Sequence, residues 1–406
     1  MIEAEVAVVG GGPAGSLVAA GLALAGHDVV VLEASRAYRW RACGVFSSPA
    51  TVAALRAAGV PDGLLAAAAR PIPAMRVETP GGVAFRLAYG GADAGPVGFD
   101  RSALDPALLA RAETAGARVC RGTRVEALAF GPRAVDLDVR HAGGGPDRVT
   151  ARLVIGADGG GSVVARAAGV TRPASLGPRV GLTFHLPDRP GDPPADARMR
   201  VFDDGYVGIA PVPGGRVNVG IVLGRGWLSR LRRDGAADVA RQVLDAVPVL
   251  DGAAGSPPDP AAWRDRTPLD AVAGASPLSH RVTRRAGGRW LLAGDAAGFL
   301  DPFTGEGLHR AVVSATLAVR AAGRAVRGDV GALAAYDRAM RRRFAAKDVV
   351  SWLVQAFLGR PELFEYAARR VDARPAVRET MGLVMGDLVP ASRALDPRFL
   401  GSLLRP

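Results

Sequence analysis

The amino-acid sequence predicts an α/β fold, in which a Rossmann-like parallel sheet is combined with an antiparallel β-sheet and C-terminal helices. Three observations support this prediction. Apolar strands at residues 6–9 and 28–32 flank a glycine-rich turn and a helix. Apolar and polar residues alternate in segments between residues 75 and 224, and helical patterns continue from about residue 329. Strand–helix–strand units build parallel sheets, whereas alternation is typical of half-buried antiparallel strands.

Length and composition describe an ordinary globular protein. The 406 residues are 49% hydrophobic and 22% charged, which argues against disorder and predicts two or three domains. The net charge is +12, but Lys347 is the only lysine and all other basic residues are arginine. No recognised nucleic-acid fold signature accompanies this charge, so we expect no nucleic-acid partner.

Cysteine content and the N-terminal segment bear on disulfides, metal sites and the cellular compartment. Cys43 and Cys120 are the two cysteines, too few for a disulfide framework, and no Cys/His spacing predicts a metal site. The N-terminal segment is acidic where a signal peptide needs positive charge. No apolar run reaches about 18 residues, the length needed to span a membrane. We therefore expect a cytoplasmic protein.

The N-terminal segment carries a dinucleotide-binding fingerprint between its first two strands. Three glycines form the pattern G-x-G-x-x-G where the strand ends and the helix begins. Such glycines allow a tight turn, let the backbone approach a pyrophosphate and let the helix pack closely on the strand. Free N–H groups of the first helical turn then face the phosphates. The expected nucleotide-binding residues are Gly10, Gly12, Pro13, Ala14 and Gly15.

An acidic residue ends the second strand. Glu33 follows Gly10 by 23 residues, where a carboxylate accepts hydrogen bonds from ribose hydroxyls. The same carboxylate would repel a 2′-phosphate. We therefore expect FAD or NAD at this site, and not NADP.

Arg101 stands at the start of a predicted helix, where a positive charge opposes the helix dipole. Asp100 and Ser102 are candidate caps for this helix. Because the helix dipole disfavours a positive charge at this position, the arginine indicates an anionic partner. The alternative is a solvated arginine in an arginine-rich chain.

Further motifs follow in a fixed order between residues 3 and 325. They are GGGPAGS, VLEAS, RACG, FDRSALD, VIGADGGGSVVAR and LAGDAAGFLDPFTGEG. Together they resemble the FAD-dependent oxidoreductases of the para-hydroxybenzoate hydroxylase fold, in the branch of geranylgeranyl reductases and related oxygenases and halogenases. The resemblance implies FAD as the cofactor and a Rossmann-like FAD-binding domain of the glutathione-reductase-like type, with an interleaved antiparallel β-sheet substrate domain.

The resemblance also assigns roles outside the fingerprint. Cys43 and Gly44 match a loop that passes the flavin, and Arg101 matches a residue that contacts the flavin nucleotide. Val125 matches a position that meets adenine through its backbone. The other cofactor-binding residues that the resemblance implies are Asp158, Gly159, Gly294, Asp295, Pro302, Gly305, Gly307 and Leu308.

The turn before a predicted helix at residues 306–322 is expected to contact the flavin itself. Asp295 matches an aspartate that holds the ribityl chain, and the backbone of Gly307 and Leu308 is expected beside the flavin ring. A helix N-terminus carries roughly half a positive charge, which would stabilise an anionic reduced flavin. The alternative is an ordinary strand–turn–helix without a ligand.

Departures from the family pattern limit the reactions that this chain is expected to catalyse. Lys347 lies outside every matching motif, which disfavours halogenation through an active-site lysine. Gly298 stands where aromatic hydroxylases usually carry a histidine. The chain keeps Tyr206 of the Tyr-x-Trp-x-Phe-Pro stretch of geranylgeranyl reductases, but has Gly208 and Ala210 at its two large aromatic positions. The loss of two rings predicts a wider or reshaped substrate cavity.

The predicted function is that of an FAD-dependent monooxygenase that hydroxylates or epoxidises a largely apolar small molecule of polyketide or isoprenoid type. The alternative is an FAD-dependent reductase of isoprenoid double bonds, and a third hypothesis is a flavin-holding protein without catalysis. Candidate catalytic residues are Tyr206, His185 and Cys43. Because no second dinucleotide fingerprint is found, NAD(P)H is expected as a transient electron donor, with a separate flavin reductase or a ferredoxin as the alternative.

The expected domain organisation is discontinuous. The FAD-binding domain comprises residues 1–70, 97–175 and 275–325, the β-rich substrate domain residues 71–96 and 176–274, and the C-terminal helical region residues 326–406. A hairpin is predicted around Gly81 and Gly82. Apolar residues between Trp352 and Leu358 follow three arginines. We expect them to pack in the core against the FAD-binding domain, with peripheral contact to a membrane surface as the alternative.

Overall fold

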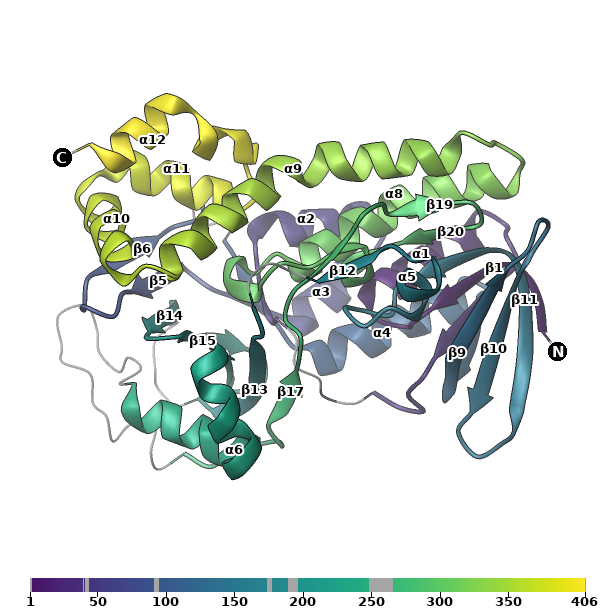
Figure 1. The fold of residues 1–406 in the computed structure, drawn as a ribbon, viewed down its shortest axis with the longest axis horizontal. Helices are drawn as coiled ribbons and strands as arrows, with labels where there is room; N and C mark the ends of the chain where they lie inside the picture. The colour runs from purple at the N-terminus through teal and green to yellow at the C-terminus, as the bar shows by residue number, and fades with distance from the viewer. Residues whose placement is uncertain are drawn as a thin grey trace.

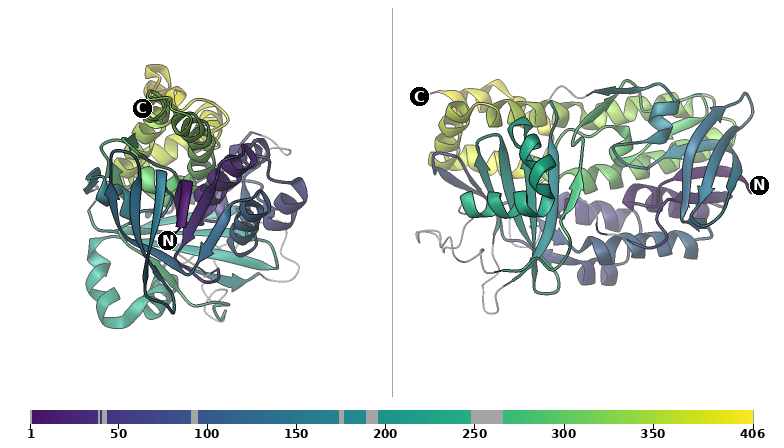
Figure 2. Two further views of the ribbon diagram at one scale, coloured as in Figure 1. Left: turned by 90° about the vertical axis from the view of Figure 1, so that its right-hand side faces the viewer. Right: turned by 60° about the horizontal axis from the view of Figure 1, so that its bottom comes forward.

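Two large β-sheets and a layer of long helices make up the fold. The structure is a computed structural model that describes residues 2–38, 40, 44–90, 95–173, 177–188, 196–247 and 266–405. Helix α9 (Ala332–Leu358) runs from the first sheet towards the second, and the two chain termini lie at opposite ends of the long axis (Figure 1). The further views show the C-terminal helices gathered at one end of the molecule (Figure 2).

The first sheet is the Rossmann-like part that the sequence predicts. Its strands are β1 (Ile2–Val9), β2 (Val29–Glu33), β8 (Arg118–Arg121), β9 (Thr123–Phe130), β10 (Val135–His141), β11 (Pro146–Gly156), β19 (Ala286–Gly287) and β20 (Trp290–Leu292). Their main order is β19-β20-β11-β1-β2-β8, and β9 and β10 extend from β11. Strand β1 pairs in parallel with both β2 and β11. Because both faces of β1 and β2 are covered, these strands are continuous apolar runs in the sequence.

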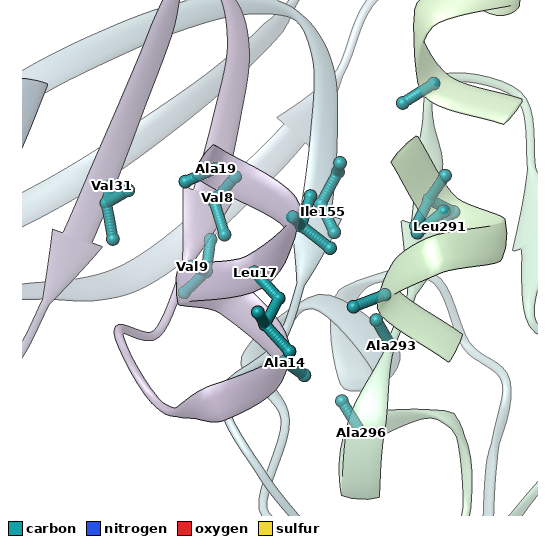
Figure 3. Packing of buried hydrophobic residues seen from close by; sticks show 14 of the residues in the cluster. Val8, Val9, Ala14, Leu17, Ala19, Val31, Ile155, Leu291, Ala293 and Ala296 are labelled. Carbon is teal, nitrogen blue, oxygen red and sulfur yellow. The ribbon is translucent and has the colours of Figure 1, made fainter. Parts of the chain in front are cut away.

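Helices cover the first sheet. They include α1 (Pro13–Leu24), α2 (Pro49–Ala57), α3 (Asp62–Ala68), α4 (Arg101–Thr114), α5 (Val163–Ala167) and α8 (Gly307–Val326). A side chain at Gly21 of α1 would come within 2.7 Å of Val319 on α8, so this glycine lets the two helices pack closely. Figure 3 shows Leu17 of α1 and Ile155 of β11 in the core beside Ala293, at the end of β20.

The second sheet is antiparallel apart from one strand pair. Its strands are β5 (Met75–Glu78), β6 (Ala84–Leu87), β13 (Val180–Pro187), β14 (Ala197–Phe202), β15 (Gly205–Val212), β16 (Arg216–Leu223) and β17 (Ala273–Ala275). Their order is β17-β13-β16-β15-β14-β5-β6, in which β14 and β5 run parallel. The antiparallel pair β5 and β6 is the hairpin predicted around Gly81 and Gly82.

The two faces of the second sheet are buried against different partners. Apolar residues of β13, β15 and β16 on one face pack against α6 (Leu228–Ala246), a helix that the sequence patterns did not predict. The opposite face turns towards the first sheet and the C-terminal helices. Smaller elements complete the fold: β3 (Phe46–Ser47), β4 (Ala69–Pro71) and β7 (Val97–Phe99) in one sheet, β12 (Thr171–Pro173) with β18 (His280–Val282), and the 3-10 turns η2 (Arg225–Trp227), η3 (Gly294–Ala297), η4 (Pro302–Thr304) and η5 (Ala391–Leu395).

The C-terminal region is helical, as predicted, and it continues beyond the helices expected from sequence. Helix α9 is followed by α10 (Pro361–Ala373), α11 (Pro375–Met385) and α12 (Pro397–Leu404). Phe357 and Leu358 pack against a buried apolar cluster of the second sheet and the C-terminal helices rather than against the FAD-binding domain, and Leu353 remains 39% exposed. Within the described residues, none of the helices combines the length and apolarity needed to cross a bilayer.

Candidate functional site

A cavity of about 940 Å³ is lined by residues of both large sheets. Its walls come from the carboxyl ends of β1, β2 and β11, from the turn at residues 294–308, and from one face of β13, β15 and β16. Ligands of open parallel sheets bind outside the carboxyl ends of the strands. The cavity therefore lies where this fold binds a nucleotide cofactor.

The residues predicted to bind the cofactor converge on this cavity. Those that line it are Gly10, Gly12, Pro13, Ala14, Glu33, Gly44, Arg101, Val125, Asp158, Gly159, Gly294, Asp295, Pro302, Gly305, Gly307 and Leu308. Gly15 is not among the lining residues, and Cys43 lies outside the described residues. The fold thus brings together motifs that are spread over most of the chain.

The glycine-rich turn shows why its residues are glycines. Gly10 has a φ of +98°, and a side chain there would meet the carbonyl oxygen of Ala157 at 2.5 Å. A side chain at Gly15 would overlap the carbonyl of Gly10, so Gly15 serves helix–strand packing, as expected. At Gly12, by contrast, no described atom lies within 4 Å of where a Cβ would stand. This open position, at the uncapped start of α1, leaves room for a phosphate group.

Glu33 is held in place by backbone groups. The N–H of Gly11 donates to Glu33 Oε2 at 2.7 Å, and the N–H of Ser35 donates to Oε1 at 2.8 Å. Each carboxylate oxygen can accept a further hydrogen bond. Val125 lines the same cavity. The carboxylate is therefore oriented at the cavity wall before any ligand binds.

Arg101 is buried rather than solvated. It is 8% exposed and forms a two-pronged ion pair with Asp105, at 2.7 and 2.9 Å, and it donates to the carbonyl of Gly44 at 3.1 Å. Asp100 is the N-cap of α4 and accepts from the N–H of Ser102. The alternative of a solvated arginine is wrong, because Arg101 lies in the cavity wall with its guanidinium fixed by Asp105.

Two aspartates bring acidic oxygens to the cavity. Asp158 accepts from the N–H of Val163 through Oδ2 at 2.7 Å, whereas its buried Oδ1 has no hydrogen-bond partner among the described residues. Burial raises the pKa of the Asp158 carboxyl. Burial also raises the pKa of Asp295, against the opposing effect of Arg101 and Arg310. A buried acceptor without a partner is costly, so a ligand that donates to Asp158 would relieve that cost.

The turn that precedes α8 is closely fitted to its surroundings. Asp301 caps η4 by accepting from the N–H of Phe303. Gly305 has a left-handed φ of +67°, and a side chain there would come within 2.6 Å of the Phe46 ring. Helix α8 then begins at Gly307 without a side-chain cap. Its first N–H groups and the positive end of its dipole therefore lie at the cavity.

A buried ion cluster supports this turn from the side of the C-terminal helices. Lys347 of α9 is 3% exposed, and its ammonium lies 3.2 Å from Glu306 and 2.9 Å from Asp387 and donates to the carbonyl of Val384 at 2.7 Å. An ammonium has three donors, and here three acceptors surround it. From the sequence, Lys347 was predicted only to lie outside the motifs of the family, and no contact was expected of it. The feature of the sequence that could have indicated its role is that it is the sole lysine in an arginine-rich chain.

Tyr206 lines the cavity and belongs to a polar chain that the sequence did not reveal. Its hydroxyl donates to Asp301 Oδ1 at 2.7 Å, and its ring meets the Phe303 ring edge-on at 5.1 Å between centroids. Arg179 donates to Asp301 Oδ2 at 2.9 Å and to Gln355 on α9. Burial raises the pKa of Tyr206 well above its ordinary value, and the neighbouring Asp301 raises it further. Tyr206 is therefore a neutral hydrogen-bond donor at neutral pH.

His185 does not line the cavity, in contrast to its predicted catalytic position. Its Nδ1 lies 2.6 Å from Asp270 Oδ2, and its ring lies 4.4 Å from that of Trp40. Asp270 also accepts from the backbone N–H of His185. The pair joins β13 to the segment around Asp270.

Sequence and fold comparisons place these features among known proteins. The family model described as FAD binding domain matches residues 3–189. Digeranylgeranylglycerophospholipid reductase 2 of Methanopyrus kandleri is 32% identical over 81% of this chain and 79% of its own length. Menaquinone reductase of Mycolicibacterium smegmatis is 29% identical over 78% of this chain and 75% of its own length.

A solved structure agrees over nearly the whole chain. The geranylgeranyl bacteriochlorophyll reductase-like protein of Thermoplasma acidophilum superimposes with a TM-score of 0.79, covering 99% of both chains at 22% identity. At this identity the likeness concerns the fold, including the second sheet and the C-terminal helices.

Proposed function

Because the chain belongs to the family of FAD-dependent oxidoreductases related to digeranylgeranylglycerophospholipid reductase, we propose that it reduces carbon–carbon double bonds in an apolar, isoprenoid-type molecule. The observation that carries the proposal is the similarity to two kinds of reductase along about four-fifths of the chain. The monooxygenase expected from sequence becomes the second candidate. It rests on the glycine and alanine at positions 208 and 210, which set the chain apart from the geranylgeranyl reductase pattern.

The residues of the cavity fit FAD. The open position at Gly12 and the uncapped N-terminus of α1 suit a pyrophosphate, and Glu33 presents a preoriented carboxylate to a ribose. The buried Oδ1 of Asp158 lacks a partner among the described residues, as expected of an acceptor that serves a ligand. When bound, FAD supplies two-electron redox chemistry. We assign the pyrophosphate to the glycine turn and the sugar-alcohol chain to Asp295.

The start of α8 is proposed to stabilise negative charge. Gly307 and Leu308 line the cavity with the free N–H groups of an uncapped helix. The first turn of α8 contains no acidic residue, and its N-cap Glu306 lies 3.2 Å from the ammonium of Lys347, which offsets the charge of that carboxylate. Such a helix end favours an anion by about 0.3–1 kcal/mol at an exposed site and more when partly buried.

The second sheet is proposed to bind the substrate and exclude water. The face that lines the cavity carries Met75, Met199 and Val222, which are buried and apolar. An apolar wall suits a hydrocarbon chain, and it strengthens every electrostatic interaction in the site by removing solvent. The substrate class therefore follows from this wall together with the relatives' named activities.

Tyr206 is proposed as the group that holds the proton needed for saturation of a double bond. Its hydroxyl is protonated at neutral pH, because burial and Asp301 raise its pKa. The hydrogen bond to Asp301 fixes the hydroxyl where β15 meets the turn before α8. Arg179 holds Asp301 in turn. A positioned acid contributes about 10²–10⁴-fold to the rate, and the raised pKa of Tyr206 places its contribution at the lower end of that range.

Product analysis with and without oxygen tests the proposal. Menaquinone and a digeranylgeranylglycerophospholipid serve as substrates for the FAD-loaded protein, with NADH, NADPH or reduced ferredoxin as the donor. We expect a product that has gained two hydrogen atoms and that forms equally well under strictly anaerobic conditions. A product that has gained an oxygen atom, and forms only in air, would establish the monooxygenase instead.

A further inference from the structure

The face of the second sheet that lines the cavity is a regular grid, because residues paired across strands point to the same side. One row joins Met199, Gly208, Gly220 and Thr183, on β14, β15, β16 and β13. The next row includes Ala210 and Asn218, which pair across β15 and β16. All six residues line the cavity. Two glycines therefore stand side by side in the middle of the cavity wall.

Neither glycine is required by the backbone. Gly208 and Gly220 do not have a positive φ, and the nearest atoms to a Cβ at these positions lie at 3.8 and 3.9 Å. A Cβ would therefore fit at both positions without backbone strain. A glycine in the interior of a strand weakens the sheet, because it adds entropy to the unfolded chain and removes a side chain that could pack. These two glycines have no structural explanation, which leaves a functional one.

The two glycines create a flat recess in the wall, which we call the glycine recess. Adjacent strands lie about 4.8 Å apart, so three strand spacings separate Met199 from Thr183 by about 14 Å. Between these two strands the wall carries only glycines, and the tip of the Met199 side chain lies 3.8 Å from the Cβ position of Gly208. A flexible chain does not need such a flat and wide surface, whereas a planar system of two or three fused rings fits it.

Asn218 adds a polar contact at the edge of the recess. It is 5% exposed, and its Nδ2 donates to Thr183 Oγ1 at 2.9 Å and to the carbonyl of Phe184 at 3.4 Å. Because Phe184 offers only an acceptor, this contact fixes the orientation of the amide. No hydrogen bond to Asn218 Oδ1 is found among the described residues. Because Asn218 lines the cavity, its amide oxygen is available to accept from a ligand there.

We propose that the glycine recess and Asn218 bind a planar, fused-ring part of the substrate that carries a hydroxyl group, with the hydroxyl donating to Asn218 Oδ1. The proposal rests on the proposed function for the reaction, since the double bond to be reduced would belong to the same molecule. Binding of the ring to the recess, by contrast, is expected whether or not the protein reduces double bonds. Ring recognition is therefore measurable without turnover.

Binding to the oxidised, FAD-loaded protein provides the test. The probes are 2-hydroxyanthracene, its methyl ether and geranylgeraniol, titrated while the flavin spectrum is followed. We expect the hydroxyl compound to bind at least tenfold more tightly than its ether, because only the former donates to Asn218. The variant Gly208→Val, which fills the recess, should weaken binding of the ring at least tenfold and more than it weakens binding of geranylgeraniol, while FAD content is retained.

Gly274→Val is the matched control. Gly274 lies in the same sheet on β17, has a similarly open Cβ position at 3.8 Å, and does not line the cavity. This variant should bind all three probes like the unaltered protein. Equal affinity for the hydroxyl compound and its ether, or unchanged ring binding in Gly208→Val, would overturn the proposal. Ring binding as expected, without any reduction of isoprenoid substrates, would instead count against the proposed function alone.

Discussion

Individual residues of the cavity differ in how far the sequence revealed them. The glycines at positions 10, 12 and 15 and the carboxylate of Glu33 follow from a local pattern, because each serves a contact within one strand–helix–strand unit. The pairing of Tyr206 with Asp301 joins residues 95 positions apart, and no local pattern encodes such a contact. His185 pairs with Asp270, a contact over 85 positions that no local pattern encodes either, and its catalytic role stays a prediction.

The variant Glu33→Ala tests the nucleotide site at the scale of one side chain. Hydrogen bonds to charged groups contribute about 1.5–3 kcal/mol each, so we expect FAD affinity to fall about tenfold or more, measured by titration of the apoprotein with FAD. Glu3→Ala, on an exposed position of β1, is the control and should bind FAD normally. Unchanged affinity in Glu33→Ala would remove this carboxylate from the site.

The variant Tyr206→Phe tests the proposed proton donor. The ring and its contact with Phe303 remain, and only the hydroxyl that donates to Asp301 is lost. We expect turnover to fall about 100-fold or more, the lower end of the contribution of a positioned acid, while FAD content and substrate affinity are retained. A variant that turns over at the original rate would show that the proton comes from another group.

At the scale of elements, α9 is tied to the start of α8 by one buried ammonium. Replacing Lys347 with methionine leaves Glu306 and Asp387 without their cation in the interior. Breaking a buried ion pair in this way costs about 3–5 kcal/mol, which urea unfolding of the two proteins would measure. Lys347→Arg should also destabilise the protein, because a planar guanidinium does not match three acceptors around one nitrogen. A loss below about 1 kcal/mol for the methionine variant would contradict this account.

The same cluster predicts a pH dependence. Burial raises the pKa of Glu306 above its ordinary value, and Lys347 opposes that rise. A carboxyl whose pKa is higher in the folded state binds more protons there, so stability falls as pH rises from the unfolded pKa of about 4.3 through the raised value. Without Lys347 the pKa of Glu306 rises further. We therefore expect the penalty of Lys347→Met to be smaller at pH 5 than at pH 8, and an equal penalty at both would argue against a charged Glu306.

The elements themselves were predictable to different degrees. The strands and helices of the first sheet carry strong apolar runs and glycine turns, and the hairpin of β5 and β6 follows from its alternation and two glycines. Helix α6 was not predicted, because its alanine- and arginine-rich segment has no side-chain cap and gives a weak helical pattern. Helices α11 and α12 were predicted only as part of a helical region over residues 326–406, without bounds of their own. The position of the second sheet against the first depends on contacts between distant segments, and it came from the family resemblance rather than from periodicity.

At the scale of the whole molecule, the cavity joins the two sheets, so its ligand should stabilise the entire fold. A ligand at a hundredfold excess over its Kd adds about 2.7 kcal/mol to the stability of the state that binds it. We expect FAD to raise the Tm of the apoprotein in a concentration-dependent manner, measured by scanning calorimetry. AMP alone, which reaches only the nucleotide end, should raise it less. A Tm that does not respond to FAD would contradict a cavity shared by both sheets.

The reaction class is tested most directly by a single turnover without oxygen. The FAD-loaded protein is reduced with one equivalent of dithionite in an anaerobic cell and mixed with menaquinone or a digeranylgeranylglycerophospholipid while the flavin absorption is recorded. The account predicts that the absorption of oxidised flavin returns at once, with one double bond saturated for each flavin. A flavin that stays reduced with either substrate, and recovers its colour only when oxygen enters, would contradict the proposed reductase.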